Sequence, residues 1–185
     1  MTQKQPSNQP FSNTTFGFMT VVEVPSLGHC GGLLLVSNIG RPIEFHFTAP
    51  VASNRTQEIM YGKTYSGFLC GDRIGAALVD KARRLPTMFV TDSPDILPVC
   101  ELIDTSLILV PSTMELESKP EPFDGKGLKS FQIDNDEIYC LNTPENQLNL
   151  IRQQAATFAS VLPFDEPFER IRQAIGEAHQ VLKVA

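Results

Sequence analysis

The sequence lacks an apolar run long enough to act as a signal sequence or to span a membrane. It also has little cysteine, with 4 thiols spread along 185 residues at Cys30, Cys70, Cys100 and Cys140. None of these spacings is typical of a disulfide framework or a zinc site. We therefore expect reduced thiols, a cytoplasmic location and no membrane partner.

Basic residues are also scarce, because 15 Lys and Arg face 21 Asp and Glu, which gives a net charge of −6. Such a charge opposes a phosphate backbone. The tightest basic cluster is Lys81 with Arg83 and Arg84, which lies where a predicted helix ends and complements its dipole. The sequence therefore predicts no nucleic-acid partner.

Motifs for ion and nucleotide binding are incomplete. Asp134 to Glu137 is acidic but lacks the glycine and the final glutamate of an EF-hand. Gly125 to Gly127 lacks the flanking strand and helix of a phosphate loop. No cofactor is expected, and nothing identifies a characterised family.

What is present is the composition of one globular domain, with 42% hydrophobic and 19% charged residues. A chain of this length buries roughly 70% of its unfolded surface. Residues 1–15 are polar and proline-bearing, which predicts a disordered tail before a single α+β domain at 16–185. Prolines and glycines at 112–127 predict a surface loop.

A strand, a hairpin and a helix open the domain. β-Branched and aromatic residues predict strands at 16–24, 32–37 and 42–48, with the turn Asn38-Ile39-Gly40 between the last two. Within the third strand, alternation places Ile43, Phe45 and Phe47 on one face and Glu44, His46 and Thr48 on the other. We expect the apolar face to join the core.

The predicted helix at 65–84 carries Gly67, Gly71 and Gly75 four residues apart. Each interior glycine costs roughly 1 kcal/mol relative to alanine. The stripe therefore indicates close packing on the sheet or on a symmetry-related helix, or else a ligand against that face. A helix that begins after Gly71 would remove the stripe.

The second half of the domain adds strands and helices. Strands at 87–91 and 106–110 flank a short proline-containing helix, which favours a parallel pair. Segments 128–133 and 137–141 form a predicted hairpin, and the 3–4 periodicity over 144–183 predicts two amphipathic helices. These helices either fold back on the sheet or present an apolar seam to a partner.

The segment Gly28-His29-Cys30-Gly31-Gly32 resembles the Gly-x-Cys-x-Gly nucleophile elbow of class I glutamine amidotransferases. That resemblance implies a cysteine nucleophile at Cys30. The family's elbow joins a strand to a helix, however, whereas a strand follows here. The family's His-x-Glu partner is also absent, because His179 precedes Gln180 and Val181. A glycine-rich turn between strands is the favoured interpretation.

Other candidate site residues are few. His29, Cys30 and His46 are competent metal ligands, but their spacing matches no known site and no metal is predicted. Asp92 completes the weak catalytic candidates, which are Cys30, His29, His46 and Asp92, and no catalytic set is assigned from them.

Polar residues between the first hairpin and the helix form a candidate binding surface. Its members are Arg41, Glu44, His46, Arg55, Gln57, Tyr61 and Lys63. Arginine and tyrosine are enriched at interfaces, and Arg55 is the expected anchor. A solvated sheet face followed by a solvated helix would give the same residues.

The sequence therefore predicts an α+β domain with a mixed, largely antiparallel sheet, a central helix after the first hairpin and two C-terminal amphipathic helices. The hairpin-then-helix start resembles roadblock or longin-type modules, which implies a platform for a dimer or a partner. We expect a non-enzymatic protein-interaction or accessory subunit of a cytoplasmic assembly, with a protein partner or a homodimer. The alternative is a small-molecule-binding protein or hydrolase with a Cys/His site near Cys30 and His46.

Overall fold

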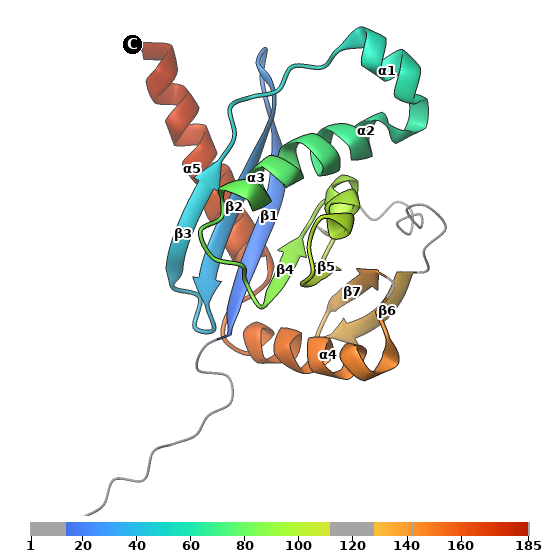
Figure 1. Ribbon diagram of the computed structural model, residues 1–185. Helices are drawn as coiled ribbons and strands as arrows, with labels where there is room; N and C mark the ends of the chain where they lie inside the picture. Colours follow the sequence, from blue (N-terminus) through green and yellow to red (C-terminus); the bar gives the residue numbers. More distant parts are fainter. Residues whose placement is uncertain (1–13, 112–127, 142, 185) are drawn as a thin grey trace, which may run out of the picture.

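The computed structural model describes residues 14–111, 128–141 and 143–184. In these residues seven strands form one sheet in the order β3-β2-β1-β4-β5-β7-β6 (Figure 1). The strands are β1 Thr15–Val24, β2 Gly28–Ser37, β3 Pro42–Phe47, β4 Met88–Thr91, β5 Ser106–Leu109, β6 Leu128–Ile133 and β7 Asp136–Leu141. The pairs β1–β4 and β4–β5 are parallel and the other neighbours antiparallel. This confirms a mixed, largely antiparallel α+β fold.

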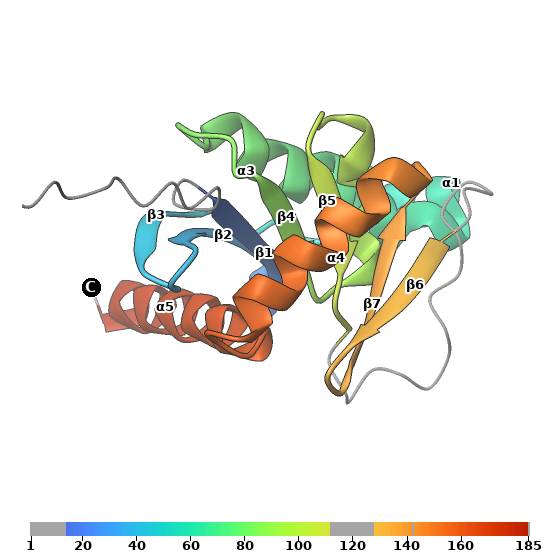
Figure 2. The ribbon, with the colours of Figure 1, turned by 90° about the horizontal axis from the view of Figure 1, so that it is seen from below.

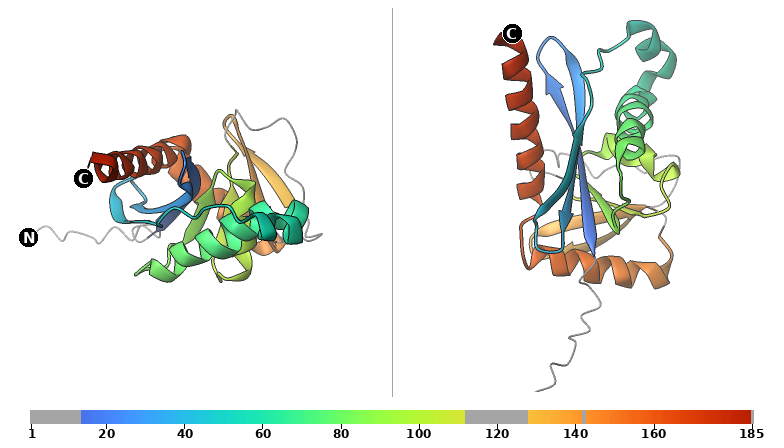
Figure 3. Two further views of the ribbon diagram at one scale, coloured as in Figure 1. Left: turned by 90° about the horizontal axis from the view of Figure 1, so that it is seen from above. Right: turned by 60° about the vertical axis from the view of Figure 1, so that its left-hand side comes forward.

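Helices cover both faces of the sheet (Figures 2 and 3). The helical segments are α1 Arg55–Tyr61, η1 Gly62–Thr64, α2 Tyr65–Gly67, the π-helical η2 Phe68–Gly75, α3 Ala76–Lys81, the 3-10 segment η3 Pro94–Glu101, α4 Glu145–Ala159 and α5 Asp165–Val184. The stretch from α2 to α3 lies on one side, and α4 and α5 lie on the other. The predicted N-terminal tail at 1–15 lies almost wholly outside the described residues, and the predicted loop at 112–127 lies wholly outside them.

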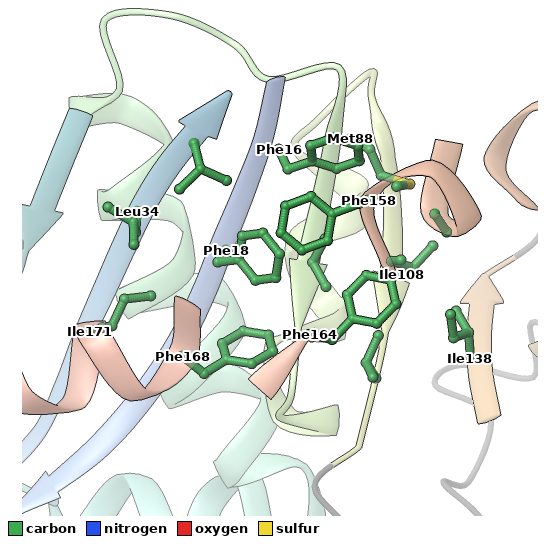
Figure 4. Packing of buried hydrophobic residues seen from close by; sticks show 14 of the residues in the cluster. Phe16, Phe18, Leu34, Met88, Ile108, Ile138, Phe158, Phe164, Phe168 and Ile171 are labelled. Atoms are coloured by element: carbon green, nitrogen blue, oxygen red, sulfur yellow. The ribbon is translucent and has the colours of Figure 1, made fainter. Parts of the chain in front are cut away.

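Two apolar cores follow from this layering. On the α4–α5 side, Phe18 packs against Phe158 and Phe168 with ring centroids 5.1 and 5.2 Å apart (Figure 4). On the other side, Leu33 and Leu35 of β2 meet buried residues of η2, α3 and β4. The C-terminal helices therefore fold back on the sheet, which was the first of the two arrangements that their periodicity allowed.

Two adjacent glycines let helices approach β2 from both sides. A Cβ on Gly31 would lie 2.2 Å from Ile74 Cγ2, and one on Gly32 would lie 2.2 Å from Ile171 Cγ2. Since neither helix could move away without opening its core, only glycine fits at either position. The prediction of a glycine-rich turn here is wrong, because β2 already begins at Gly28.

The glycine stripe of the central helix also serves packing. A Cβ on Gly71 would lie 2.7 Å from Pro98 Cβ, and one on Gly75 would lie 3.2 Å from Val99 Cγ2. Both neighbours belong to η3, which is neither the sheet nor a second copy of the helix. The helical stretch includes Gly71 and ends at Lys81, three residues before the predicted end.

The face of β3 predicted to be core is partly exposed. Ile43, Phe45 and Phe47 keep 40%, 37% and 39% of their surface accessible. The reason is tertiary, because α5 packs mainly on β1 and β2 and covers the edge strand only in part, where His179 meets Phe47. Conversely, Glu44 and His46, predicted to be the solvated face, are half-buried beside the chain that follows α3.

Candidate functional site

Cys30 is enclosed in the structure. Its side chain is fully buried and its Sγ donates to the Thr48 carbonyl oxygen at 3.0 Å. Burial raises the pKa of this thiol, and the hydrogen bonds to Thr48 only partly oppose that rise. A nucleophilic cysteine needs an accessible thiolate. The geometry therefore gives no support to an activated elbow at Cys30.

The two histidines of the candidate Cys/His site lie at separate places along the sheet. His29 is bridged to Val51, whereas His46 lies opposite Leu33 and contacts Glu44. His29 lines a cavity of about 400 Å³. Glu23, Glu58 and Asp95 are among the other residues that line this cavity. Among the described residues there is no group of three His, Cys, Asp or Glu side chains suited to hold a metal ion.

Asp92 immediately follows β4 and is the most deeply buried carboxylate among the candidates, with 5% of its surface exposed. Its Oδ2 forms an ion pair with Arg172 of α5. Burial raises the pKa of Asp92, while the Thr20 hydroxyl and Arg172 act in the opposite direction. Its other oxygen, Oδ1, has no hydrogen-bond partner of ordinary geometry.

A cavity of about 450 Å³ opens beside Asp92. It lies where β5 ends, where the β6–β7 hairpin turns and where α5 begins. Its lining combines Asp134, Asp136 and Asp165 with the apolar side chains of Phe164 and Phe168. Ligand sites favour the carboxyl ends of parallel strands, and β4 and β5 both end here. We call this cavity the Asp92 pocket.

The predicted polar surface is divided between two parts of the molecule. Arg41, Glu44 and His46 belong to β3 or its approach, while Arg55, Gln57, Tyr61 and Lys63 lie on α1 and η1. Figures 1 and 3 show α1 at the far end of the connection from β3. The seven side chains thus do not form one surface.

The α1 segment projects from the body of the molecule. None of its residues is buried, and the Asn54 side chain caps it by accepting from the backbone N–H groups of Thr56 and Gln57. The Arg55 side chain is 82% exposed and pairs with Glu58. Tyr61 stacks on Phe68 with ring centroids 4.0 Å apart. Arg55 is therefore accessible, while the Tyr61 ring anchors the segment.

β3 forms one end of the sheet and, in the described part of the chain, pairs only with β2. The Thr48 N–H donates to the Gly31 carbonyl at 2.9 Å, so Thr48 faces β2. Because backbone direction alternates along a strand, Phe47 and Phe45 direct their N–H and C=O groups away from the sheet. The edge therefore combines free backbone groups with the exposed side chains of Ile43, Phe45 and Phe47, which we call the β3 strip.

Sequence reasoning identified Asp92 but missed its surroundings. Arg172 is 80 positions away, and the carboxylates of the pocket come from a hairpin turn and a helix start. The one available signal was that an acidic residue follows a predicted parallel strand. Nothing in the sequence indicated that the β3 strip is exposed. The alternation of apolar and polar residues along β3 is equally typical of a strand whose apolar face is covered.

No protein-family model matches the chain, and no curated protein matches it in sequence. A crystal structure of endonuclease V from Ciona intestinalis, bound to DNA with an inosine followed by a ribo-adenosine, is similar with a TM-score of 0.45 and 8% identity. That match covers 89% of this chain and 86% of the other. Argonaute from Marinitoga piezophila, bound to a 5′ OH guide RNA, gives a TM-score of 0.35 and 12% identity. It covers 78% of this chain but only 26% of the Argonaute chain.

The exclusion of a nucleic-acid partner is corrected by these matches, because both similar proteins were solved with a nucleic acid bound. Net charge describes a whole chain and not one surface. A net charge of −6 is therefore not sufficient to exclude a nucleic-acid partner. At these identities and TM-scores, the likeness supports no statement about what this chain binds.

No described helix is both long and apolar enough to cross a membrane.

Proposed function

We propose that this chain is a non-enzymatic protein-interaction subunit that binds an extended segment of a partner polypeptide along β3. The observation that carries this proposal is that one edge strand combines exposed apolar side chains with backbone groups that have no strand partner among the described residues. Strand addition uses both features, since main-chain hydrogen bonds supply affinity and alternate side-chain contacts supply specificity.

The β3 strip has the chemistry of a contact surface. Phe45 and Phe47 stack with ring centroids 5.9 Å apart, and the Phe47 ring meets His179 of α5 edge-on at 6.4 Å. The strip is therefore held in place before any partner arrives. Preorganised aromatic side chains lose little conformational entropy on binding and commonly supply most of the binding energy.

Edge strands normally carry features that prevent such pairing, including charged side chains that point along the edge. On β3 the polar residues Glu44 and His46 instead face the opposite side, where Glu44 accepts from the Arg83 backbone N–H at 2.7 Å. The strip is left free of charge. We place the module in the cytoplasm, because the spacing of its four cysteines in the sequence is not that of a disulfide framework.

The test begins with p-benzoylphenylalanine incorporated at position 45, followed by photo-crosslinking in the native host. The matched control carries the same group at Gln132, an exposed position on the opposite edge strand β6. We expect one polypeptide to crosslink from position 45 and not from position 132. Equal labelling from both positions would contradict the proposal.

The captured polypeptide is then purified and its binding measured directly. Hydrogen exchange should show new protection at the Phe45 and Phe47 amides, because these point away from β2, with little change at Glu44 and His46. Phe45→Lys should weaken binding by about tenfold or more, and Gln132→Lys should leave it unchanged. Binding without protection at Phe45 and Phe47 would rule out strand addition.

A further inference from the structure

The residue pattern of β3 is symmetric about Phe45. Ile43 and Phe47 flank this residue at equal distances along the strand, and so do Glu44 and His46. When two such strands pair antiparallel about Phe45, residues at equal and opposite distances from the centre lie opposite one another on the same face of the sheet. β3 therefore matches a second copy of itself, with apolar residues against apolar residues and a carboxylate against an imidazole.

The backbone of β3 suits the same arrangement. Phe45 directs its N–H and C=O groups away from β2, toward a side with which no described strand pairs (Figure 1). Two Phe45 residues related by a two-fold axis would exchange two main-chain hydrogen bonds. An axis perpendicular to the sheet keeps α5 of both copies on the same face. The two β3 strips then lie side by side as one apolar surface.

The neighbouring registers fit less well. A shift of one residue would turn the apolar residues of one copy to the opposite face of the sheet. Pairing centred on Glu44 would place two carboxylates directly opposite each other, which is destabilising. Pairing centred on His46 would place Ile43 opposite the partner's Ala49, beyond the end of β3. The register centred on Phe45 is the one that matches the whole strip without opposing like charges.

We propose that the polypeptide bound along β3 is a second copy of this chain, and that the two β3 strands pair antiparallel about Phe45 into one continuous sheet. The inference rests on the proposed function, because it names the partner that adds to this edge. A strand that receives an unrelated peptide needs no symmetry about its own centre. Since one edge of six residues makes a small interface, we expect a dissociation constant on the order of 10 µM.

Sedimentation equilibrium of the full chain, at concentrations from about 1 to about 200 µM, tests the proposal. We expect a monomer at the lowest concentrations and a dimer at the highest. The parent chain is used without substitution, so the result does not depend on the folding of a variant. A chain that remains monomeric at about 200 µM would overturn the proposal.

Charge substitutions at the centre of the pair test its register. Because Phe45 lies opposite the partner's Phe45, Phe45→Lys and Phe45→Glu should each weaken self-association about tenfold or more. An equimolar mixture of the two variants should form a mixed dimer at least about fivefold tighter than either variant forms with itself. Gln132→Lys, on the opposite edge strand, should dimerise like the parent chain.

Two results with these variants would contradict the pairing about Phe45. One is a Phe45→Lys variant that dimerises like the parent chain, which would place the contact elsewhere. The other is a mixture that associates no more tightly than its separate components. Far-UV circular dichroism confirms that each variant is folded.

The photo-crosslinking experiment separates this inference from the proposed function. Capture of this chain itself from position 45 would support both. Capture of a different polypeptide at position 45 would overturn the second copy as partner and leave strand addition at β3 standing. Equal labelling from positions 45 and 132 would contradict both.

Discussion

The two ends of the sheet are built in opposite ways. On β6, Phe131 points inward, is 7% exposed and lies under the Arg152 guanidinium at 5.2 Å, while Ser130 and Gln132 face solvent. On β3, the apolar side chains are the exposed ones and the polar side chains are half-buried. Both strands are edges with six residues. The difference is therefore not one of strand length or position.

Helix placement accounts for this difference. α4 packs against β6 and closes its apolar face, whereas α5 packs mainly on β1 and β2 and covers β3 only in part, with His179 against Phe47. An edge with a buried apolar face and a polar outer face resists association, and one with the opposite arrangement favours it. The contrast singles out β3 as the edge suited to a partner.

The largest expected difference concerns the aromatic residues of the two edges. Phe131→Ala should lower the free energy of unfolding by about 3 kcal/mol, because it removes a buried ring and leaves a cavity. Phe45→Ala should lower it by only about 1 kcal/mol, because 37% of that residue is already exposed. Urea denaturation of both variants measures the two values. Equal losses would mean that the β3 strip is part of the core.

A smaller effect is expected from the carboxylate of Glu44, which is half-buried beside the chain that follows α3. The Arg83 backbone N–H and then His46 lower the pKa of Glu44 below its ordinary value of 4.5. Its ionised form therefore stabilises the fold above pH 4.5, and that stability is lost as the pH falls through the lowered pKa. Glu44→Gln should cost about 1 kcal/mol at pH 7 and nothing at low pH.

The control for this pH dependence is Glu23→Gln, at an exposed position on β1. Denaturation midpoints are measured for both variants from neutral to acidic pH. A Glu44→Gln deficit that persists at low pH would show that packing, and not the ionised carboxylate, is responsible.

A small gain in stability is expected at the turn of the β6–β7 hairpin. The pKa of Asp136 is raised above 3.8 by burial and by Asp165 and Asp134, so its ionised form destabilises the fold. Asp136→Asn should therefore raise the thermal midpoint at neutral pH, and the gain should disappear below pH 3.8, where both states carry the proton. Calorimetry at the two pH values tests this sign.

The smallest effect is expected from the ion pair of β6. Lys129 Nζ lies 3.0 Å from Glu145 Oε2, with side-chain exposures of 42% and 83%. Such pairs are screened by water and salt. Lys129→Met should change the free energy of unfolding by less than about 0.5 kcal/mol. A dependence on Lys129 that survives high salt would indicate packing of its alkyl chain instead.

Much of the fold could be predicted from the sequence. The β1 and β3 strands, the parallel β4–β5 pair, the β6–β7 hairpin and both C-terminal helices lie within a few residues of their expected places. The start of β2 was missed because Gly28 to Gly32 has the composition of a turn. Its glycines are required by Ile74 and Ile171, which approach from two helices distant in the chain.

The candidate sites were less predictable for the same reason. The pairing of Asp92 with Arg172 joins residues 80 positions apart, and the pocket beside them joins five segments. Local spacing carries no information about such contacts. The Gly28 to Gly32 motif resembled a nucleophile elbow, but the closed packing around Cys30 removes the accessibility that such a site requires.

The sequence by itself determined the alternation of β3, the periodicity of α4 and α5 and the turn at Gly40, whose φ of +72° suits glycine. These are local properties, fixed by the geometry of a few consecutive residues. Only the tertiary structure decided which face of β3 is covered and which carboxylates meet at the Asp92 pocket. Burial depends on where α5 lies over the sheet, and that position is set by contacts with β1 and β2, more than a hundred residues earlier in the chain.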